Sequence, residues 1–181
     1  MAKYQASKIL AHKATLDWVA AHQPLPFQVI TMHPVCVAGP DMTRTVKEQP
    51  LAFINDIILR SLDQGVVCIP PVFVDVRDVS RAHVAALKLP RQDSEEKEKG
   101  RGVVKEFLLA GRPTSWAAIS RFVKEKEYGV LSRMSTDEET YPEPPVTETE
   151  RAERELGIEW MPVEVTLGDV CREKRALERA S

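Results

Sequence analysis

The sequence predicts an α/β protein that contains at least part of a parallel sheet. β-Branched, nearly uncharged runs alternate along the chain with segments whose apolar residues recur every three or four positions. The main strand run is apolar throughout, as in strands that are covered on both faces. With 181 residues, 43% of them hydrophobic and 29% charged, the chain is long enough to bury one core, and a single domain is expected.

Three strands are expected, which is fewer than such a fold normally has. Residues 27–37 (FQVITMHPVCV) are typical of a central strand with neighbours on both sides. Residues 66–76 contain Pro70 and Pro71 and suit a short edge strand, and residues 106–110 form a third. A sheet of this class has about five or six strands, so the sequence indicates that part of the sheet is missing.

Helical spacing and turn residues define the helices. The first has a broad apolar face and ends before Pro24, while Gly65 and Gly157 end later ones. Residues 91–102 are expected to form a charged surface loop, and the polar, proline-containing residues 132–150 to lack regular structure. The expected helices are 2–22, 50–62, one capped by Asp75 or Asp78 that reaches Leu89, 116–127 with Thr114 or Ser115 as its cap, 147–156 and 164–179.

Composition narrows the possible partners. The net charge of −2 implies no basic surface for nucleic acid or anionic lipid. The longest apolar stretches are far shorter than a bilayer span, and the N-terminus carries lysines where a signal peptide would be apolar, so a cytoplasmic protein is expected. Cys36, Cys68 and Cys171 are widely spaced and form no C-x-x-C pair, which predicts neither a disulfide framework nor a metal site.

Tyr4 and Lys8 are the first candidates for chemistry. They stand four residues apart on the first helix, so both side chains project from one face. A neighbouring ammonium favours the phenolate form of a tyrosine, which makes it a usable acid or base for proton transfer to a carbonyl oxygen. One pair at this spacing also arises by chance, and it does not identify an enzyme by itself.

Four segments in order make the chain similar to extended short-chain reductases of the NAD-dependent epimerase/dehydratase family, especially the dihydroflavonol, cinnamoyl-CoA, aldehyde and methylglyoxal reductases. The first resembles their Y-x-x-S-K-x-x-A-E-x-A-x-W helix, and the second their N-P-x-x-V-x-G-P strand end. The third resembles [FY]-[VI]-D-V-R-D-V-A-x-A-H, and the fourth L-G-x-x-x-x-P-x-E-E-T-L. In this sequence they begin with Tyr4-Gln-Ala-Ser-Lys8, Met32-His33-Pro34-Val35-Cys36-Val37-Ala38-Gly39-Pro40, Phe73-Val74-Asp75-Val76-Arg77-Asp78-Val79 and Glu155-Leu156-Gly157, the last followed by Pro162 and Val163-Glu164-Val165-Thr166-Leu167.

The resemblance implies a partial Rossmann-type NAD(P)-binding fold and an oxidoreductase that reduces an aldehyde or ketone by hydride transfer. Tyr4 would protonate the carbonyl oxygen and also contact the cofactor, and Lys8 would favour the Tyr4 phenolate and bind the nicotinamide ribose. The backbone of Pro34, Val35, Cys36 and Val37 would lie along the nicotinamide, with the Cys36 side chain packing rather than reacting. NADP(H) is expected in preference to NAD(H). A small carbonyl compound or alcohol is the expected substrate, and a homodimer would form through the first helix.

Other polar residues of these segments are interpreted as structural. Asp75, Arg77 and Asp78 are expected to form an ion-paired helix start that anchors the substrate lobe. His83 is expected to be a core histidine with its polar atoms satisfied. His33 replaces the usual Asn of the strand motif and has no assigned role.

The chain departs from the family in lacking a glycine-rich turn for the dinucleotide pyrophosphate. None of its 8 glycines forms G-x-x-G-x-x-G or G-x-G-x-x-G. The selector for the ribose 2′ position and the catalytic Ser or Thr before the Tyr are absent too. The resemblance therefore covers the second half of the family's fold, without its N-terminal βαβ half. Residues 1–65 would end the cofactor-binding core, and 66–181 would be mainly substrate lobe.

Three functions follow as hypotheses. The first is an NAD(P)H-dependent carbonyl reductase, with this chain as a truncated form that has little activity alone. The second is a non-catalytic short isoform that docks on a full-length reductase. The third is a sugar-nucleotide epimerase or dehydratase, which shares Tyr-x-x-x-Lys, although the V-D-V-R-D-V signature favours the reductase. The substrate is left open, as is whether Met1 is the true start.

Overall fold

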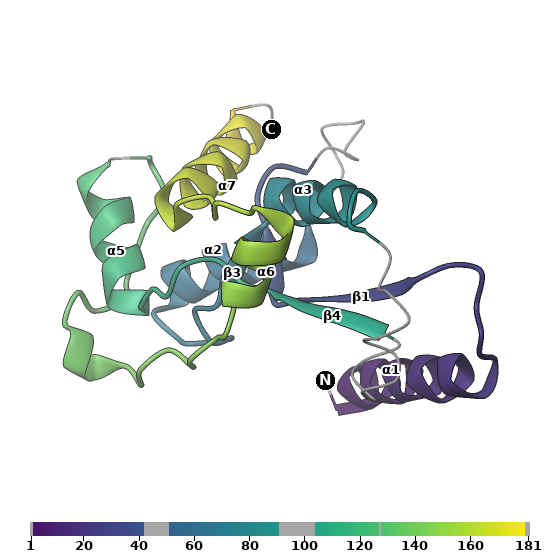
Figure 1. Cartoon of the computed structure of the whole chain (residues 1–181). Coiled ribbons are helices and arrows are strands. Elements are labelled where there is room, and N and C mark those ends of the chain that lie inside the picture. The colour runs from purple at the N-terminus through teal and green to yellow at the C-terminus, as the bar shows by residue number, and fades with distance from the viewer. Residues whose placement is uncertain (1, 42–50, 91–103, 127, 180–181) are drawn as a thin grey trace.

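The computed structural model describes residues 2–41, 51–90, 104–126 and 128–179, and it is an α/β fold (Figure 1). Helices and parallel strands alternate along most of the chain, as the sequence predicts. The helices are α1 (Ala2–Ala21), α2 (Phe53–Gln64), α3 (Val76–Ala86), α5 (Trp116–Glu125), the 3-10 helix η1 (Glu138–Thr140), α6 (Glu150–Leu156) and α7 (Val163–Glu178). The strands are β1 (Val29–Pro34), β2 (Cys36–Ala38), β3 (Phe73–Asp75) and β4 (Val104–Leu109).

The strands form two short parallel pairs that are joined into one layer. β1 lies beside β4 with Val29 opposite Val104, and β2 lies beside β3 with Cys36 opposite Phe73. The Val35 amide, between β1 and β2, donates to the Leu109 carbonyl at 3.0 Å. Beyond β4 the Gly111 amide donates to the Phe73 carbonyl at 2.7 Å. Residues 29–38 therefore run through the layer and exchange one neighbour, β4, for another, β3.

The expected strands are present, with one large difference in extent. The strand predicted at 66–76 is confined to 73–75. Pro70 and Pro71 have no amide hydrogen to donate to a neighbouring strand, and Val66 and Val67 before them are exposed. Within the described residues β1 pairs on one side only, with β4, so the second neighbour expected for a central strand is not found there.

The predicted helix ends are also found. The Asp75 carboxylate accepts a hydrogen bond from the Arg77 amide at the start of α3, and the Ser115 hydroxyl does the same for Ala118 of α5. Gly65 ends α2 in the left-handed conformation, with φ +69°. The polar segment 132–150 contains the short η1 helix. The predicted charged loop, 91–102, lies outside the described residues.

The interior consists of two hydrophobic clusters, one on each side of the β2–β3 pair. One is built by α2, α5 and α7 around Ile58 and Trp116, whose indole nitrogen donates to the Ile69 carbonyl at 2.9 Å. The other is built by β3, β4, α3 and α6 around Phe107 and Trp160. None of the described helices has both the length and the apolar character to cross a membrane.

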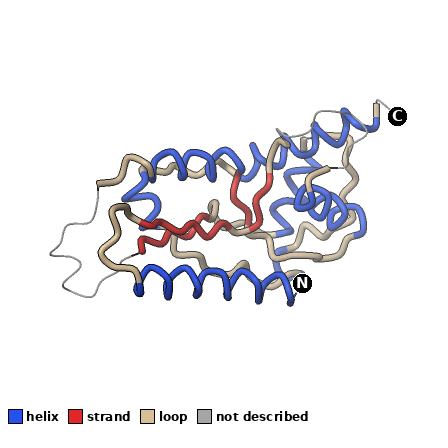
Figure 2. Tube along the Cα trace, turned by 90° about the vertical axis from the view of Figure 1, so that its right-hand side faces the viewer, coloured by secondary structure: helices blue, strands red, loops and turns tan. Residues whose placement is uncertain are grey.

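Helix α1 differs most from the prediction. It runs alongside β1 and β4 at one edge of the molecule (Figures 1 and 2). Its predicted apolar face is not buried, since Ile9 is 69% and Leu10 64% exposed, and Val19 is its one buried side chain among residues 3–21. No other described element covers the outer side of the helix. The spacing of apolar residues therefore predicts the helix correctly but not the burial of its apolar face.

Substitution of Trp116 should destabilise the protein far more than substitution of Trp18. Trp116 is 1% exposed and its indole is hydrogen-bonded, so Trp116→Ala is expected to lower the free energy of unfolding by about 3–5 kcal/mol. Trp18 is 47% exposed, and Trp18→Ala should cost within about 1 kcal/mol. Urea denaturation followed by circular dichroism measures both, and equal losses would contradict the described core.

Candidate functional site

Tyr4 and Lys8 lie side by side on the first turns of α1, as their spacing predicts. The Lys8 ammonium nitrogen is 5.4 Å from the centre of the Tyr4 ring, and Tyr4 is 66% exposed. The Ser7 hydroxyl donates to the Tyr4 carbonyl at 2.7 Å. The phenol and the ammonium therefore face solvent together, where both could reach one ligand.

The position of α1 against the strands places this pair relative to the sheet. His12, in the middle of α1, contacts His33 near the end of β1, with ring centres 4.6 Å apart. Because α1 runs antiparallel to β1 (Figure 2), residues before His12 extend past the carboxyl end of the strand. At 1.5 Å per residue Tyr4 lies about 12 Å farther along that direction. In open α/β sheets ligands bind outside the carboxyl ends of the strands, which is where Tyr4 and Lys8 lie.

Residues 34–37 form the crossing between β1 and β2, at the same end of the sheet. The Val35 amide is bonded to Leu109, so this backbone is held against β4. Cys36 is half-buried and packs against the larger core cluster. Burial raises the pKa of the Cys36 thiol, which keeps it protonated and unreactive near neutral pH. This agrees with the expected packing role of Cys36.

A tight turn follows β2 and is held by Asn55, a residue that sequence reasoning missed. The Asn55 side chain donates to the Gly39 carbonyl at 2.7 Å and accepts from the Gly39 amide at 3.2 Å. Gly39 has φ +121°, and a Cβ there would lie 3.2 Å from Val76 Cγ1 and 3.3 Å from an Asp75 oxygen. The signal in the sequence is a polar residue, Asn55, among the apolar residues Ile54, Ile57 and Ile58 of the predicted helix.

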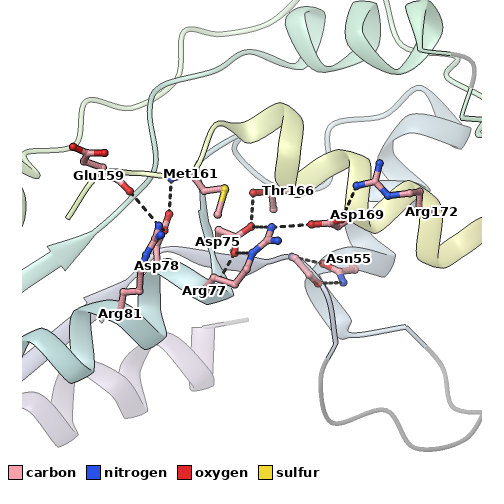
Figure 3. Close-up of polar contacts among 11 residues, drawn as sticks. Asn55, Asp75, Arg77, Asp78, Arg81, Glu159, Met161, Thr166, Asp169 and Arg172 are labelled. Atoms are coloured by element: carbon pink, nitrogen blue, oxygen red, sulfur yellow. Dashed lines mark hydrogen bonds and ion pairs between the residues drawn. The ribbon is translucent and has the colours of Figure 1, made fainter.

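Asp75 is the centre of a polar network that joins α3 to α7 (Figure 3). Its two oxygens accept from Arg77 at 2.8 Å each, and the Thr166 hydroxyl donates to it at 2.6 Å. Arg77 also pairs with Asp169 of α7 at 2.8 Å. The predicted ion-paired helix start is confirmed, and its partners on α7 are additions that the sequence did not identify. With every contact satisfied inside the protein, Asp75 is structural rather than catalytic.

Asp78 makes a second link from α3, to the segment after α6. Its buried carboxylate accepts from the Met161 amide at 2.8 Å and pairs with Arg81. Arg81 also donates to the Glu159 carbonyl at 3.2 Å (Figure 3). The V-D-V-R-D-V segment is therefore an anchor whose two carboxylates bind two different parts of the C-terminal region.

One of the two histidines singled out in the sequence, His83, does not lie where it was expected. His83 was predicted to be a core residue, but it is exposed, and its ring Nδ1 lies 2.7 Å from the Val79 carbonyl. The buried face of α3 carries Asp78 and Ala82, and the next residue along a helix points about 100° away from it. His33, which had no assigned role, lies in a cluster with His12 and Glu106.

Comparisons with known proteins relate the chain to reductases. No protein-family model matches it. It is 27% identical over 177 residues to the ketoreductase sphI of Aspergillus fumigatus, which covers 94% of this chain and 48% of that protein. It is 38% identical over 93 residues to the ketoreductase azaE of Aspergillus niger, covering 48% of this chain and 27% of that protein. The chain thus spans less than half the length of these curated relatives.

The fold is similar to that of a solved structure. The crystal structure of Gre2 from Candida albicans in complex with NADPH superposes with a TM-score of 0.70 at 20% identity, over 96% of this chain and 51% of that one. The chain has the fold of about half of a Rossmann-type, NADPH-binding protein. The predicted resemblance to reductases and the predicted partial Rossmann-type fold are both confirmed.

Loss of the Asp75 charge should destabilise the protein in a pH-dependent way. Burial raises the pKa of Asp75, but hydrogen bonds from Arg77 and Thr166 outweigh it, so the net pKa lies below the ordinary value. A carboxyl whose pKa is lower in the folded state stabilises the protein above its unfolded pKa, about 3.9, and loses this contribution as pH falls through the folded value. Asp75→Asn should therefore cost about 3 kcal/mol at pH 7 and clearly less at pH 3.

Urea denaturation at the two pH values measures this difference. Asp56→Asn is the matched control, because Asp56 forms an exposed ion pair with Arg60, and its cost should stay within about 1 kcal/mol. An Asp75→Asn deficit that is as large at pH 3 as at pH 7 would contradict a lowered pKa.

Proposed function

We propose that this chain, a homologue of ketoreductases with the fold of one half of an NADPH-binding protein, supplies the proton donor and most of the substrate lobe of a carbonyl reductase. The observation that carries the proposal is the solvent-facing Tyr4–Lys8 pair at the carboxyl end of the β1–β4 pair. The substrate is a small aldehyde or ketone, or the corresponding alcohol in reverse. NADP(H), when bound, supplies the hydride.

In this proposal the residues of the chain bind, orient and move a proton. The Tyr4 hydroxyl donates its proton to the carbonyl oxygen of the substrate. The Lys8 ammonium, 5.4 Å from the ring centre of Tyr4, favours the phenolate that results and binds the nicotinamide ribose. The backbone of residues 34–37, fixed by the bond from Val35 to Leu109, would lie along the nicotinamide.

The chain fits only one end of such a cofactor. Tyr4, Lys8 and residues 34–37 suit the nicotinamide and its ribose, whereas the sequence contains no glycine-rich turn for the pyrophosphate. We therefore assign residues 1–65 to the cofactor side and 66–181 mainly to the substrate lobe. The pyrophosphate and the adenosine would be bound by residues other than these.

A reductase is preferred to a sugar-nucleotide epimerase or dehydratase on the evidence of the relatives. The two curated relatives compared above are named ketoreductases, and one of them aligns with 94% of this chain. Turnover of a uridine diphosphate sugar with no net oxidation of NADPH would favour the epimerase instead.

Tyr4→Phe should lower kcat for carbonyl reduction by about 100-fold or more and change KM for NADPH far less, because the ring is kept while the transferred proton is lost. Lys8→Met should lower kcat and also raise KM for NADPH. NADPH oxidation is measured on the natural protein, isolated with an antibody against residues 130–150 so that any segments accompanying this chain are retained. Tyr128→Phe and Lys13→Met are the matched controls, and losses in them equal to those in Tyr4→Phe and Lys8→Met would refute the assignment.

The exposed face of α1 supports a second candidate function, a non-catalytic module that docks on a full-length reductase. Ile9 and Leu10 present a large apolar surface on a helix whose neighbouring strand, β1, has one edge unpaired within the described residues. The same face would also serve a homodimer. Co-expression with a full-length ketoreductase should then increase the soluble yield of this chain.

Leu10→Glu should abolish this rescue, since it places a carboxylate in the proposed contact. Val146→Glu is the control, because Val146 is 93% exposed on a distant loop. Yield and co-purification are measured together. A soluble yield that does not change with the co-expressed reductase would eliminate the docking function.

A further inference from the structure

Three side chains that the proposed reaction does not use converge on one point between α1 and the sheet. His12 comes from α1, His33 from β1 and Glu106 from β4. His12 Nε2 lies 3.4 Å and His33 Nε2 3.8 Å from the same Glu106 oxygen. One potential ligand atom from each residue lies within 4.8 Å of those of the other two.

The fold brings these residues together for geometric reasons. Side chains alternate across a strand, so His33 lies on the same face of β1 as Thr31. Glu106 is opposite Thr31 in the β1–β4 register and therefore shares that face. Helix α1 crosses this face and points His12 toward it, which the contact of the His12 and His33 rings demonstrates.

The donor set is that of a metal site. Two imidazole nitrogens and one carboxylate oxygen are the protein ligands of catalytic zinc sites, and they bind such an ion at about 2.0–2.2 Å. Ligand atoms around a tetrahedral ion of that radius are separated by about 3.4 Å. The two nitrogen–oxygen separations, 3.4 Å and 3.8 Å, therefore need to contract by a few tenths of an ångström at most. The side chains are 28%, 37% and 43% exposed, which admits an ion from solvent and leaves a position open to water.

The alternative is a purely structural contact between hydrogen-bonded side chains. Both distances to Glu106 exceed the usual 2.7–3.2 Å of an N–H···O hydrogen bond, so the three side chains are spaced too widely for strong direct bonds. The Thr31 hydroxyl, 3.2 Å from His33 Nε2, is the other polar neighbour. In the family patterns quoted above, the position of His12 is Glu and the position of His33 is Asn.

We propose that His12, His33 and Glu106 bind a divalent transition-metal ion of the zinc class. The ion would join α1 to both strands of the β1–β4 pair. Because residues 3–11 of α1 are exposed, this joint would set the direction in which the N-terminal turns, with Tyr4 and Lys8, extend from the sheet. The proposal goes beyond the carbonyl reductase activity and does not depend on it, because none of the three side chains takes part in the proposed reaction. It replaces the expectation from the sequence that the chain has no metal site.

The test uses the tag-free chain and two metals. Titration with Co²⁺ should produce visible absorption bands that saturate at one ion per chain, and Zn²⁺ should displace it and raise the melting temperature. His33→Asn and Glu106→Gln should each weaken metal binding by more than about tenfold. Loss of a residue that only hydrogen-bonds a metal ligand already costs about tenfold to hundredfold in affinity, and loss of the ligand itself costs more. His83→Asn, at an exposed histidine of α3, is the matched control and should bind normally.

A second measurement uses no variant, so misfolding of a variant cannot account for its result. Diethyl pyrocarbonate modification of the wild-type chain, read by peptide mass spectrometry, should be slowed at His12 and His33 by Zn²⁺ and unchanged at His22 and His83. Equal protection of all four histidines, or equal Co²⁺ affinity in all variants, would show adventitious binding and overturn the proposal. Absence of saturable binding would overturn it as well.

Discussion

The buried carboxylate of Asp75, through its bond to Thr166, joins the β3–α3 junction to the C-terminal helix α7. Asp75 ends β3, caps α3 and accepts from α7 in a single carboxylate. The turn at Gly39 packs directly on this carboxylate, and Asn55 holds the turn from α2. β3, α3, α7 and α2 are therefore connected through one buried charge. Hydrogen bonds from Arg77 and Thr166 offset the free energy of removing that charge from water.

This arrangement separates the packed interior of the molecule from the pair of residues to which we assign the chemistry. The two hydrophobic clusters and the Asp75 and Asp78 anchors surround β2, β3 and the C-terminal helices. Tyr4 and Lys8 stand outside that interior, on a helix whose own apolar residues face solvent. Support for α1 therefore comes from Val19, from the polar contacts of His12 and, in the proposed reductase, from the cofactor and whatever covers its outer face.

Much of the fold could be predicted from the sequence, because local signals determine it. Asp75 as a cap, Gly65 and Gly157 as helix ends and the adjacency of Tyr4 and Lys8 follow from rules that span a few residues. The catalytic and cofactor roles given to Tyr4, Lys8 and residues 34–37 stay predictions. The features that the sequence did not predict depend on how distant segments are placed in space. Periodicity shows which residues of α1 are apolar but not what lies against them. The contact of His12, His33 and Glu106 can be predicted only when the register of the strands is known. The short β3 strand shows the opposite case, because a local signal, Pro70 and Pro71, predicts a short edge strand there.

The anchors of α3 also constrain the order of events when the chain is synthesised. Thr166 is 91 residues away from Asp75, and Met161 is 83 residues away from Asp78. Their contacts cannot form until residues 161–166 have left the ribosome, and contacts this distant in sequence slow folding. Until then the two carboxylates at the start of α3 lack their distant partners. The emerging chain therefore has β3 and α3 synthesised before the contacts that hold them to the C-terminal region can form.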